Sequence, residues 1–268
     1  TQPNTRSSVA SVTLGKLTYI GEYAFYGTQI TEMPNFDANT VVERYAFGKS
    51  SVASVVIPDG MNVPDGMFAE CMFLTSVTLG NDVTVGEFAF ITNRNHNLRA
   101  VQVTIGNKTG YKFVFASSIV KVEIGNNVVL GKSEFQNAAS MKSVTLGEND
   151  EIGEQAFYNC EALVNIDLSK AKSIGTRAFS GDTYYICADN TMNMENPLVV
   201  NNMYQFQFVS PAMASVDLSS AESVGSYAFA FCPNLTSVVL SENTVTNVVA
   251  LYDTADYTGT TLEVPNGV

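Results

Sequence analysis

The sequence predicts a solenoid, mainly β, because two short motifs recur along it with one shared period. One motif is a hexapeptide of the form Ile-Gly-x-x-Ala-Phe, and the other has the form Leu-x-x-Val-x-Leu. A fixed period of about 20–50 residues is typical of proteins in which each repeat buries its apolar face on its neighbours. We therefore expect a single solenoid domain over residues 1–268, with about 11–12 repeats of ~22 residues and one parallel sheet of as many short strands.

Each copy of the hexapeptide ends at a phenylalanine that we call its landmark. Clear copies span residues 20–25, 85–90, 152–157, 174–179 and 224–229. Weaker copies end at Phe47, Phe68, Phe115, Phe135 and Phe208, and a degenerate copy ends at Leu251. Most successive landmarks are separated by about 22 residues, and the longest step runs from Phe179 to Phe208. We expect the first residue and the Phe of each copy to close the core behind the sheet.

The second motif predicts the strands of that sheet. Its copies span residues 9–14, 52–57, 74–79, 119–124, 141–146, 163–168, 213–218 and 235–240. The Val-x-Leu alternation is typical of a short strand that buries one face. In almost every repeat the last Leu or Ile precedes the landmark by the same interval, so the two motifs form one module. Because no segment has the periodicity of a standard helix, we expect tight turns and short 3₁₀ pieces on the convex side.

Some repeats depart from this module. Residues 33–36 interrupt the second strand pattern, the fifth repeat has extra residues around Thr104, and the ninth contains an insertion within residues 181–202. The insertion includes Tyr184, Tyr185 and Cys187. Extra length in one repeat maps to a loop, and loops on a rigid scaffold often carry function. Tyr184 and Tyr185 are therefore candidate binding residues, and the alternative is a surface excursion without a role.

The outward face of the predicted sheet is small, hydroxylated and mildly acidic. Strand alternation points two columns of residues away from the core. The column before the central Val holds Ser11, Ser54, Ser76, Ala100, Lys121, Ser143, Asn165, Ser215, Ser237 and Thr261, and the column after it holds Thr13, Val56, Thr78, Gln102, Glu123, Thr145, Asp167, Asp217, Val239 and Glu263. Glu123, Asp167 and Asp217 offer ligands for a cation or for sugar hydroxyls, although a solvated acidic face is the simpler interpretation.

The composition argues against several classes of partner. The net charge is −12, from 26 acidic and 14 basic residues, which disfavours nucleic acid and anionic lipid. No apolar run approaches the ~20 residues of a membrane-spanning helix, so we expect no membrane insertion within this chain. The chain starts at Thr1 without a hydrophobic leader, and we expect that its natural beginning, with any export signal, has been removed.

The sequence also carries no recognisable catalytic or metal-binding motif. His96 is the single histidine, and CxxC, HExxH, GxSxG and glycine-rich phosphate loops are absent, so we expect no enzyme activity and no cofactor. Cys71, Cys160 and Cys232 each follow a landmark by three residues and fall in one column, four and three predicted turns apart. At about 4.8 Å per turn, their sulfurs are ~14–19 Å apart, too far for a disulfide. We interpret them as small buried hydrophobes.

The combined motif resembles the BspA-like leucine-rich repeats, whose unit runs Ile-Gly-x-x-Ala-Phe-x-x-Cys-x-x-Leu-x-x-Val-x-Leu. Residues 156–163 and 228–235 reproduce the junction of the two motifs closely, and the resemblance covers residues 9–264. It implies a leucine-rich-repeat solenoid that acts as a non-catalytic interaction or adhesion module, secreted or at the cell surface of a host-associated microbe. The implied partner is a protein or glycan on host or neighbouring cells. The alternative is a structural spacer within a larger surface protein.

Overall fold

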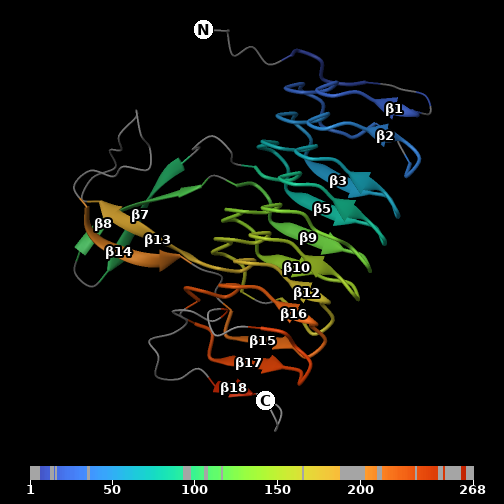
Figure 1. The fold of residues 1–268 in the computed structure, drawn as a ribbon. Coiled ribbons are helices and arrows are strands. Elements are labelled where there is room, and N and C mark those ends of the chain that lie inside the picture. The colour runs from blue at the N-terminus through green and yellow to red at the C-terminus, as the bar shows by residue number, and fades with distance from the viewer. Residues whose placement is uncertain are drawn as a thin grey trace.

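The computed structural model describes residues 7–12, 15, 17–34, 37–92, 98–105, 108–115, 117–164, 166–187, 203–209, 213–232, 234–246, 250 and 261–263. These residues form a mainly β solenoid whose turns stack one on the next from the blue to the red end of the chain (Figure 1). Within them, no helix is long and apolar enough to cross a membrane. The predicted fold class is confirmed, but the number of turns and the number of sheets differ from the prediction.

The Leu-x-x-Val-x-Leu motifs form the first ladder, a parallel sheet in two parts. One part has the order β10-β9-β5-β3 and the other the order β15-β17-β18. The strands are β3 (Ser54–Ile57), β5 (Ser76–Leu79), β9 (Lys121–Ile124), β10 (Ser143–Thr145), β15 (Ser215–Leu218), β17 (Ser237–Leu240) and β18 (Thr261–Glu263). In β3, exposed Ser54 and Val56 alternate with buried Val55 and Ile57. The predicted alternation is confirmed, because successive side chains of a strand point to opposite faces.

The start of each hexapeptide forms a second ladder, which the prediction of one parallel sheet missed. Its strands are β1 (Tyr19–Ile20), β2 (Val41–Val42), β4 (Asn62–Val63), β6 (Thr84–Val85), β11 (Glu151–Ile152), β12 (Ser173–Ile174) and β16 (Ser223–Val224). Isolated bridges of Val129 and Val245 extend it. Where a glycine follows the strand, it lets adjacent backbones approach closely, because a Cβ at Gly225 would lie 2.5 Å from the Thr176 nitrogen. The two ladders are joined by tight turns, and a 3₁₀ conformation occurs in the described part of the chain at Ala250.

The landmark phenylalanines stack as one column through the core. The ring centroids of successive pairs are separated by 5.0 Å for Phe25–Phe47, 5.6 Å for Phe47–Phe68, 5.4 Å for Phe68–Phe90, 5.5 Å for Phe90–Phe135, 5.4 Å for Phe135–Phe157, 5.2 Å for Phe157–Phe179 and 5.5 Å for Phe179–Phe229. Phe115 and Phe208 lie outside this column. The described solenoid therefore has about eight turns instead of the predicted 11–12.

Phe115 and Phe208 belong to two hairpins that interrupt the solenoid. The first hairpin pairs β7 (Leu98–Ile105) with β8 (Lys108–Phe115), and the second pairs β13 (Asp182–Cys187) with β14 (Met203–Val209), both antiparallel. Cys187 pairs with Tyr111, so the hairpins merge into one sheet of order β14-β13-β8-β7, which we call the accessory sheet. It lies on the opposite side of the solenoid from the first ladder (Figure 1).

The accessory sheet corrects two predictions about the insertions. Ala100 and Gln102 lie in β7, so they do not belong to the outward columns; instead β5 pairs directly with β9. The insertion placed within residues 181–202 is longer, since its second strand reaches Val209. Both hairpins leave the solenoid near the same point of the repeat, because Thr92 and Gly181 each lie two residues after a landmark. Insertions at equivalent points emerge on the same side, where their strands can pair.

The three column cysteines are buried and form no disulfide, as predicted. Because Phe115 and Phe208 are not landmarks of the column, Cys71 and Cys160 are three turns apart, and Cys160 and Cys232 are two turns apart. At the spacing of adjacent strands these separations are ~14 and ~10 Å, still too long for a disulfide. Each thiol donates a hydrogen bond to the carbonyl of the landmark in the turn before its own. The bonds run from Cys71 to Phe47 at 3.2 Å, from Cys160 to Phe135 at 3.2 Å and from Cys232 to Phe179 at 3.3 Å. These hydrogen bonds link adjacent turns. Burial raises the pKa of the Cys160 and Cys232 thiols to about 12, which makes these two thiols poor nucleophiles near neutral pH.

Candidate functional site

Glu123, on the exposed face of β9, is held by its neighbours. Its Oε1 accepts a hydrogen bond from Lys121 Nζ at 2.6 Å, and its Oε2 accepts one from Thr78 Oγ1 at 3.3 Å. The hydrogen bond and charge of Lys121 hold the pKa of Glu123 below its usual range. The local pair is therefore close to neutral, and the carboxylate has less capacity left for a ligand.

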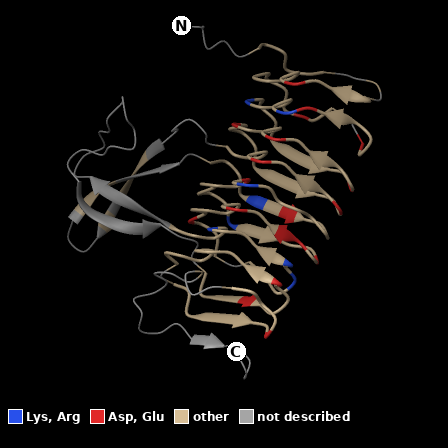
Figure 2. Ribbon diagram, viewed as in Figure 1, with Lys and Arg blue, Asp and Glu red and all other residues tan. Residues whose placement is uncertain are grey.

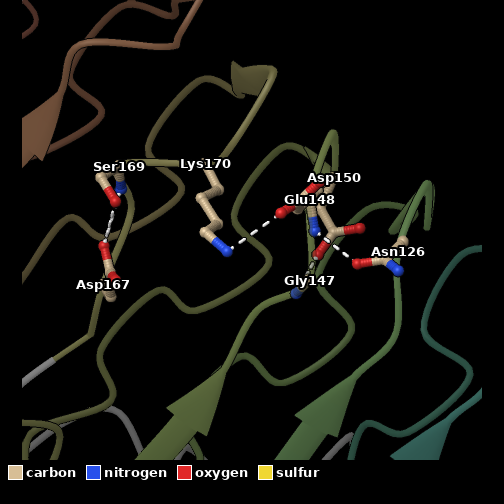
Figure 3. Close-up of polar contacts among 7 residues, drawn as sticks. All are labelled: Asn126, Gly147, Glu148, Asp150, Asp167, Ser169 and Lys170. Carbon is tan, nitrogen blue, oxygen red and sulfur yellow. Dashed lines mark hydrogen bonds and ion pairs between the residues drawn. The ribbon is translucent and has the colours of Figure 1, made fainter.

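Asp167 and Asp217 each close a local turn. Asp167 Oδ1 accepts from the Ser169 hydroxyl at 2.6 Å and from the Ser169 amide at 3.0 Å, and Asp217 Oδ1 accepts from the Ser219 amide at 2.9 Å (Figure 3 shows the first pair). The Ser169 hydrogen bonds lower the pKa of Asp167. Such side-chain-to-backbone bonds are typical of turns.

The three predicted carboxylates therefore do not form one site. Residues 166–168 are not in a strand, and the first ladder divides there between β10 and β15. No group of three or more His, Cys, Asp or Glu that could hold a metal ion occurs among the described residues. In Figure 2, the described acidic residues are distributed along the solenoid from its first turns to its last. Their predicted binding role stays a prediction.

Tyr184 and Tyr185 lie in β13 of the accessory sheet. In the antiparallel register, they pair with Gln207 and Phe206 of β14. β13 lies within the range where the sequence placed an insertion, but the sequence did not predict its pairing with β14 or with the first hairpin. Their role in binding stays a prediction.

The turns beside the second hairpin line a half-open pocket that the sequence did not predict. The cavity has a volume of about 410 Å³ and is lined by Tyr158, Arg177, Ser180, Gly181, Tyr227 and Phe231, among others. We call it the stem pocket, because Gly181 directly precedes β13. Arg177 is exposed, and the three aromatic residues are half-buried.

Arg177 and Tyr227 occupy the fourth position of their hexapeptides. This position has a positive φ in each described copy, at Tyr23, Tyr45, Gly66, Phe88, Ser133, Gln155, Arg177 and Tyr227. The ladder maintains this left-handed conformation, since the Arg177 amide donates to the Ser226 carbonyl of the next turn at 3.0 Å. Residues at the fourth position of adjacent turns therefore lie next to each other, and the Arg177 guanidinium lies over the Tyr227 ring, 5.6 Å from its centroid.

Arg177 has no carboxylate partner within the described part of the chain. Six of the eight basic side chains described there form ion pairs, as in Arg44–Glu22, Lys49–Glu70, Lys121–Glu123, Lys132–Glu154, Lys170–Glu148 and Lys172–Glu151. Lys142 and Arg177 form none with the residues described. A cation without an acidic partner is unusual on a chain whose net charge is −12.

The same column is aromatic at the N-terminal end of the solenoid. Tyr23 stacks on Tyr45 at 5.4 Å and meets Tyr26 edge to face at 5.3 Å. Glycines leave room for these rings, because a Cβ at Gly48 would lie 2.8 Å from Tyr26 Cδ2. Tyr23 is half exposed, at 50%. The cation beside this cluster, Lys49, is paired with Glu70, which distinguishes the cluster from the stem pocket.

The two parallel ladders, the stacked landmark column and the repeated Leu and Ile core define a solenoid of the leucine-rich-repeat type. The chain belongs to the family described as BspA type leucine rich repeat region, which matches it in six copies over residues 4–121, 103–188 and 182–255. This confirms the predicted resemblance. No curated protein matches the chain in sequence.

Several solved structures are similar to the chain. A leucine rich cell surface protein from Faecalibacterium prausnitzii A2-165 is 16% identical over 94% of this chain and 58% of its own, with a TM-score of 0.45. A leucine-rich repeat protein from Bacteroides ovatus ATCC 8483 is 17% identical over 94% of this chain and 83% of its own, with a TM-score of 0.37. The pneumococcal vaccine antigen PcpA is 13% identical over 89% of this chain and 64% of its own, with a TM-score of 0.33. The chain thus spans less than two thirds of the length of the first and the third.

Proposed function

We propose that this chain is a non-catalytic interaction segment of a secreted or cell-surface protein, and that the accessory sheet contacts the partner. The location follows from the BspA-like family, whose members the resemblance associates with the cell surface. The partner is a protein or glycan on host or neighbouring cells.

The observation that carries this proposal is the continuity of the solenoid across both insertions. Phe90 stacks on Phe135, and Phe179 on Phe229, at the same 5.5 Å spacing, although each pair is separated in sequence by about twice the usual step. The residues of the accessory sheet are therefore not needed to continue the column. Insertions that a rigid repeat scaffold does not need for its own folding often carry a binding function.

A scaffold without the insertions can be designed from the repeat itself. In uninterrupted turns such as those of Phe68 and Phe157, a cysteine follows the landmark by three residues. Replacing residues 93–116 by one cysteine, and residues 182–210 by another, restores at both places the step that separates Phe135 from Phe157. We call this the insertion-free variant. It should retain a cooperative thermal transition and a β-rich circular dichroism spectrum.

Binding of the full chain and of the insertion-free variant to immobilised matrix proteins and to epithelial cells tests the proposal. We expect the full chain to bind and the variant to lose most of that binding. Equal binding by both would remove the accessory sheet from the contact surface. Binding by neither would favour the spacer hypothesis, which the continuous ring column and the plain Ser/Thr face of the first ladder also support.

A further inference from the structure

The stem pocket combines flat aromatic walls with one cation that has no carboxylate partner among the described residues. Arg177 supplies the cation, and Tyr158, Tyr227 and Phe231 contribute the rings. A guanidinium matches a carboxylate geometrically, through two parallel hydrogen bonds. The cation–π contact with Tyr227 restricts the guanidinium before a ligand arrives, which reduces the ordering cost of binding.

The size and the charge of the surroundings narrow the ligand class. A volume of about 410 Å³ falls in the range of small-molecule sites and exceeds the space that one carboxylate needs. Tyrosine presents an apolar face and a polar hydroxyl, which suits a ring with both C–H faces and hydroxyl groups. The net charge of −12 repels polyanionic partners but opposes a single carboxylate far less.

We propose that the stem pocket binds a sugar that carries one carboxylate, such as a uronic or sialic acid. The Arg177 guanidinium pairs with the carboxylate, and the tyrosine rings pack against the sugar ring. This goes beyond the proposed function, because the pocket is built mainly from solenoid turns and its ligand does not depend on contacts made by the accessory sheet.

Gln is a suitable replacement at positions 177 and 227. The preceding turn already carries Gln155 at the same position with φ 56°, close to the 55° of Arg177 and the 58° of Tyr227. Arg177→Gln therefore removes the charge without straining the backbone, and because Arg177 is exposed the melting temperature should not change. Lys142→Gln is the matched control, since it removes the other described basic residue that lacks a carboxylate partner within the same part of the chain.

Saturation-transfer NMR and calorimetry on the full chain test the site with glucuronate and N-acetylneuraminate as probes. We expect at least one acid to bind, about tenfold or more weaker binding by Arg177→Gln, a smaller loss by Tyr227→Gln, and no change in Lys142→Gln. Failure of both acids to bind, or equal binding by Arg177→Gln, would overturn the proposal. If glucose bound as tightly as the acids, the carboxylate would not be recognised and the proposal would be wrong. If free glutamate bound as tightly, the pocket would recognise a peptide carboxylate instead of a sugar acid, which would also overturn the proposal. These outcomes are independent of the cell-binding experiment.

Discussion

The solenoid and the accessory sheet are assembled in opposite ways. Each solenoid turn contacts the turns before and after it, and the ring column runs unbroken past both hairpins. The accessory sheet, in contrast, joins segments far apart in the chain where Cys187 pairs with Tyr111. Repeat proteins draw their stability from neighbouring units, so one turn can accept an insertion at little cost. The accessory sheet needs both insertions to reach four strands.

The solenoid and the accessory sheet also differ in how deeply their side chains are buried. Landmarks such as Phe157 and Phe179 are 0% exposed. In β7 and β8, Ala100, Gln102 and Thr109 are exposed. We infer that the solenoid supplies most of the stability, while the accessory sheet supplies surface.

The largest effect should come from the ring column. Phe157 lies between Phe135 and Phe179 at 5.4 and 5.2 Å, so Phe157→Ala should lower the free energy of unfolding by about 3–5 kcal/mol. Thr109→Ala removes a surface hydrogen bond to Thr104 at 3.0 Å and should cost less than about 1 kcal/mol. Urea denaturation of both variants measures the difference. Similar losses would mean that the accessory sheet contributes to the cooperative core.

The next effect is a pH dependence that arises in the solenoid. Asp150 is buried, and its carboxylate accepts from the Val128 amide at 2.8 Å and from the Gly147 amide at 2.9 Å (Figure 3 shows the bond from Gly147). Burial outweighs these bonds and raises the pKa of Asp150 from 3.8 to about 6. The protonated form is therefore favoured by folding, and this contribution is complete below about pH 4 and lost as pH rises through about 6.

The loss by pH 7.5 should be at most about 3 kcal/mol, since one pKa unit corresponds to about 1.4 kcal/mol and solvent screening reduces the effect. Asp150→Asn should remove this part of the pH dependence, as measured by urea denaturation from pH 4 to pH 7.5. The insertion-free variant should keep it, because Asp150 lies in an uninterrupted turn. Loss of the pH dependence in the insertion-free variant would show that the accessory sheet controls the environment of Asp150.

A smaller effect should come from Glu134, in the turn directly after the first insertion. It occupies the Ala position of the hexapeptide, it is 0% exposed, and neither carboxylate oxygen has a hydrogen-bond partner among the described residues. Burial raises its pKa well above 4.5, although the nearby amides of Phe90 and Ala89 oppose the rise without good hydrogen-bond geometry. The group is therefore held neutral and unsatisfied in the core.

Glu134→Met should stabilise the protein by about 1–3 kcal/mol, because it removes an unsatisfied buried carboxyl at similar volume. Met67 already occupies the equivalent position and is fully buried. Ala156→Met, in the next turn, is the matched control and should destabilise by overpacking. Thermal and urea unfolding of both variants give the comparison. Destabilisation by Glu134→Met would indicate that the carboxyl makes a structural hydrogen bond in solution.

Periodicity predicted the solenoid well but miscounted its turns for a definable reason. The steps from Phe90 to Phe135 and from Phe179 to Phe229 each exceed the regular step by an insertion somewhat longer than one repeat. Phe115 and Phe208 therefore fell near the expected positions of landmarks. The sequence did not predict the second ladder, because its strands are too short to show a recognisable alternation of apolar and polar residues.

The candidate site was only partly predictable for the same reason. The second insertion was recognised by its length, and Tyr184 and Tyr185 were selected within it. Arg177 and Tyr227 were not, since counting Phe208 as a landmark placed a whole turn between them. With the landmarks corrected, the hexapeptide alignment alone places these two side chains in adjacent turns.

Local pattern was sufficient for the repeating features: the buried face of each strand, the landmark column and the shared column of buried cysteines. Those features depend on contacts between consecutive turns, which repeat whenever the motif repeats. The pairing of Cys187 with Tyr111, and with it the four-stranded accessory sheet, depends on segments that meet once and have no periodic signal. Only the packing of the whole chain brings them together.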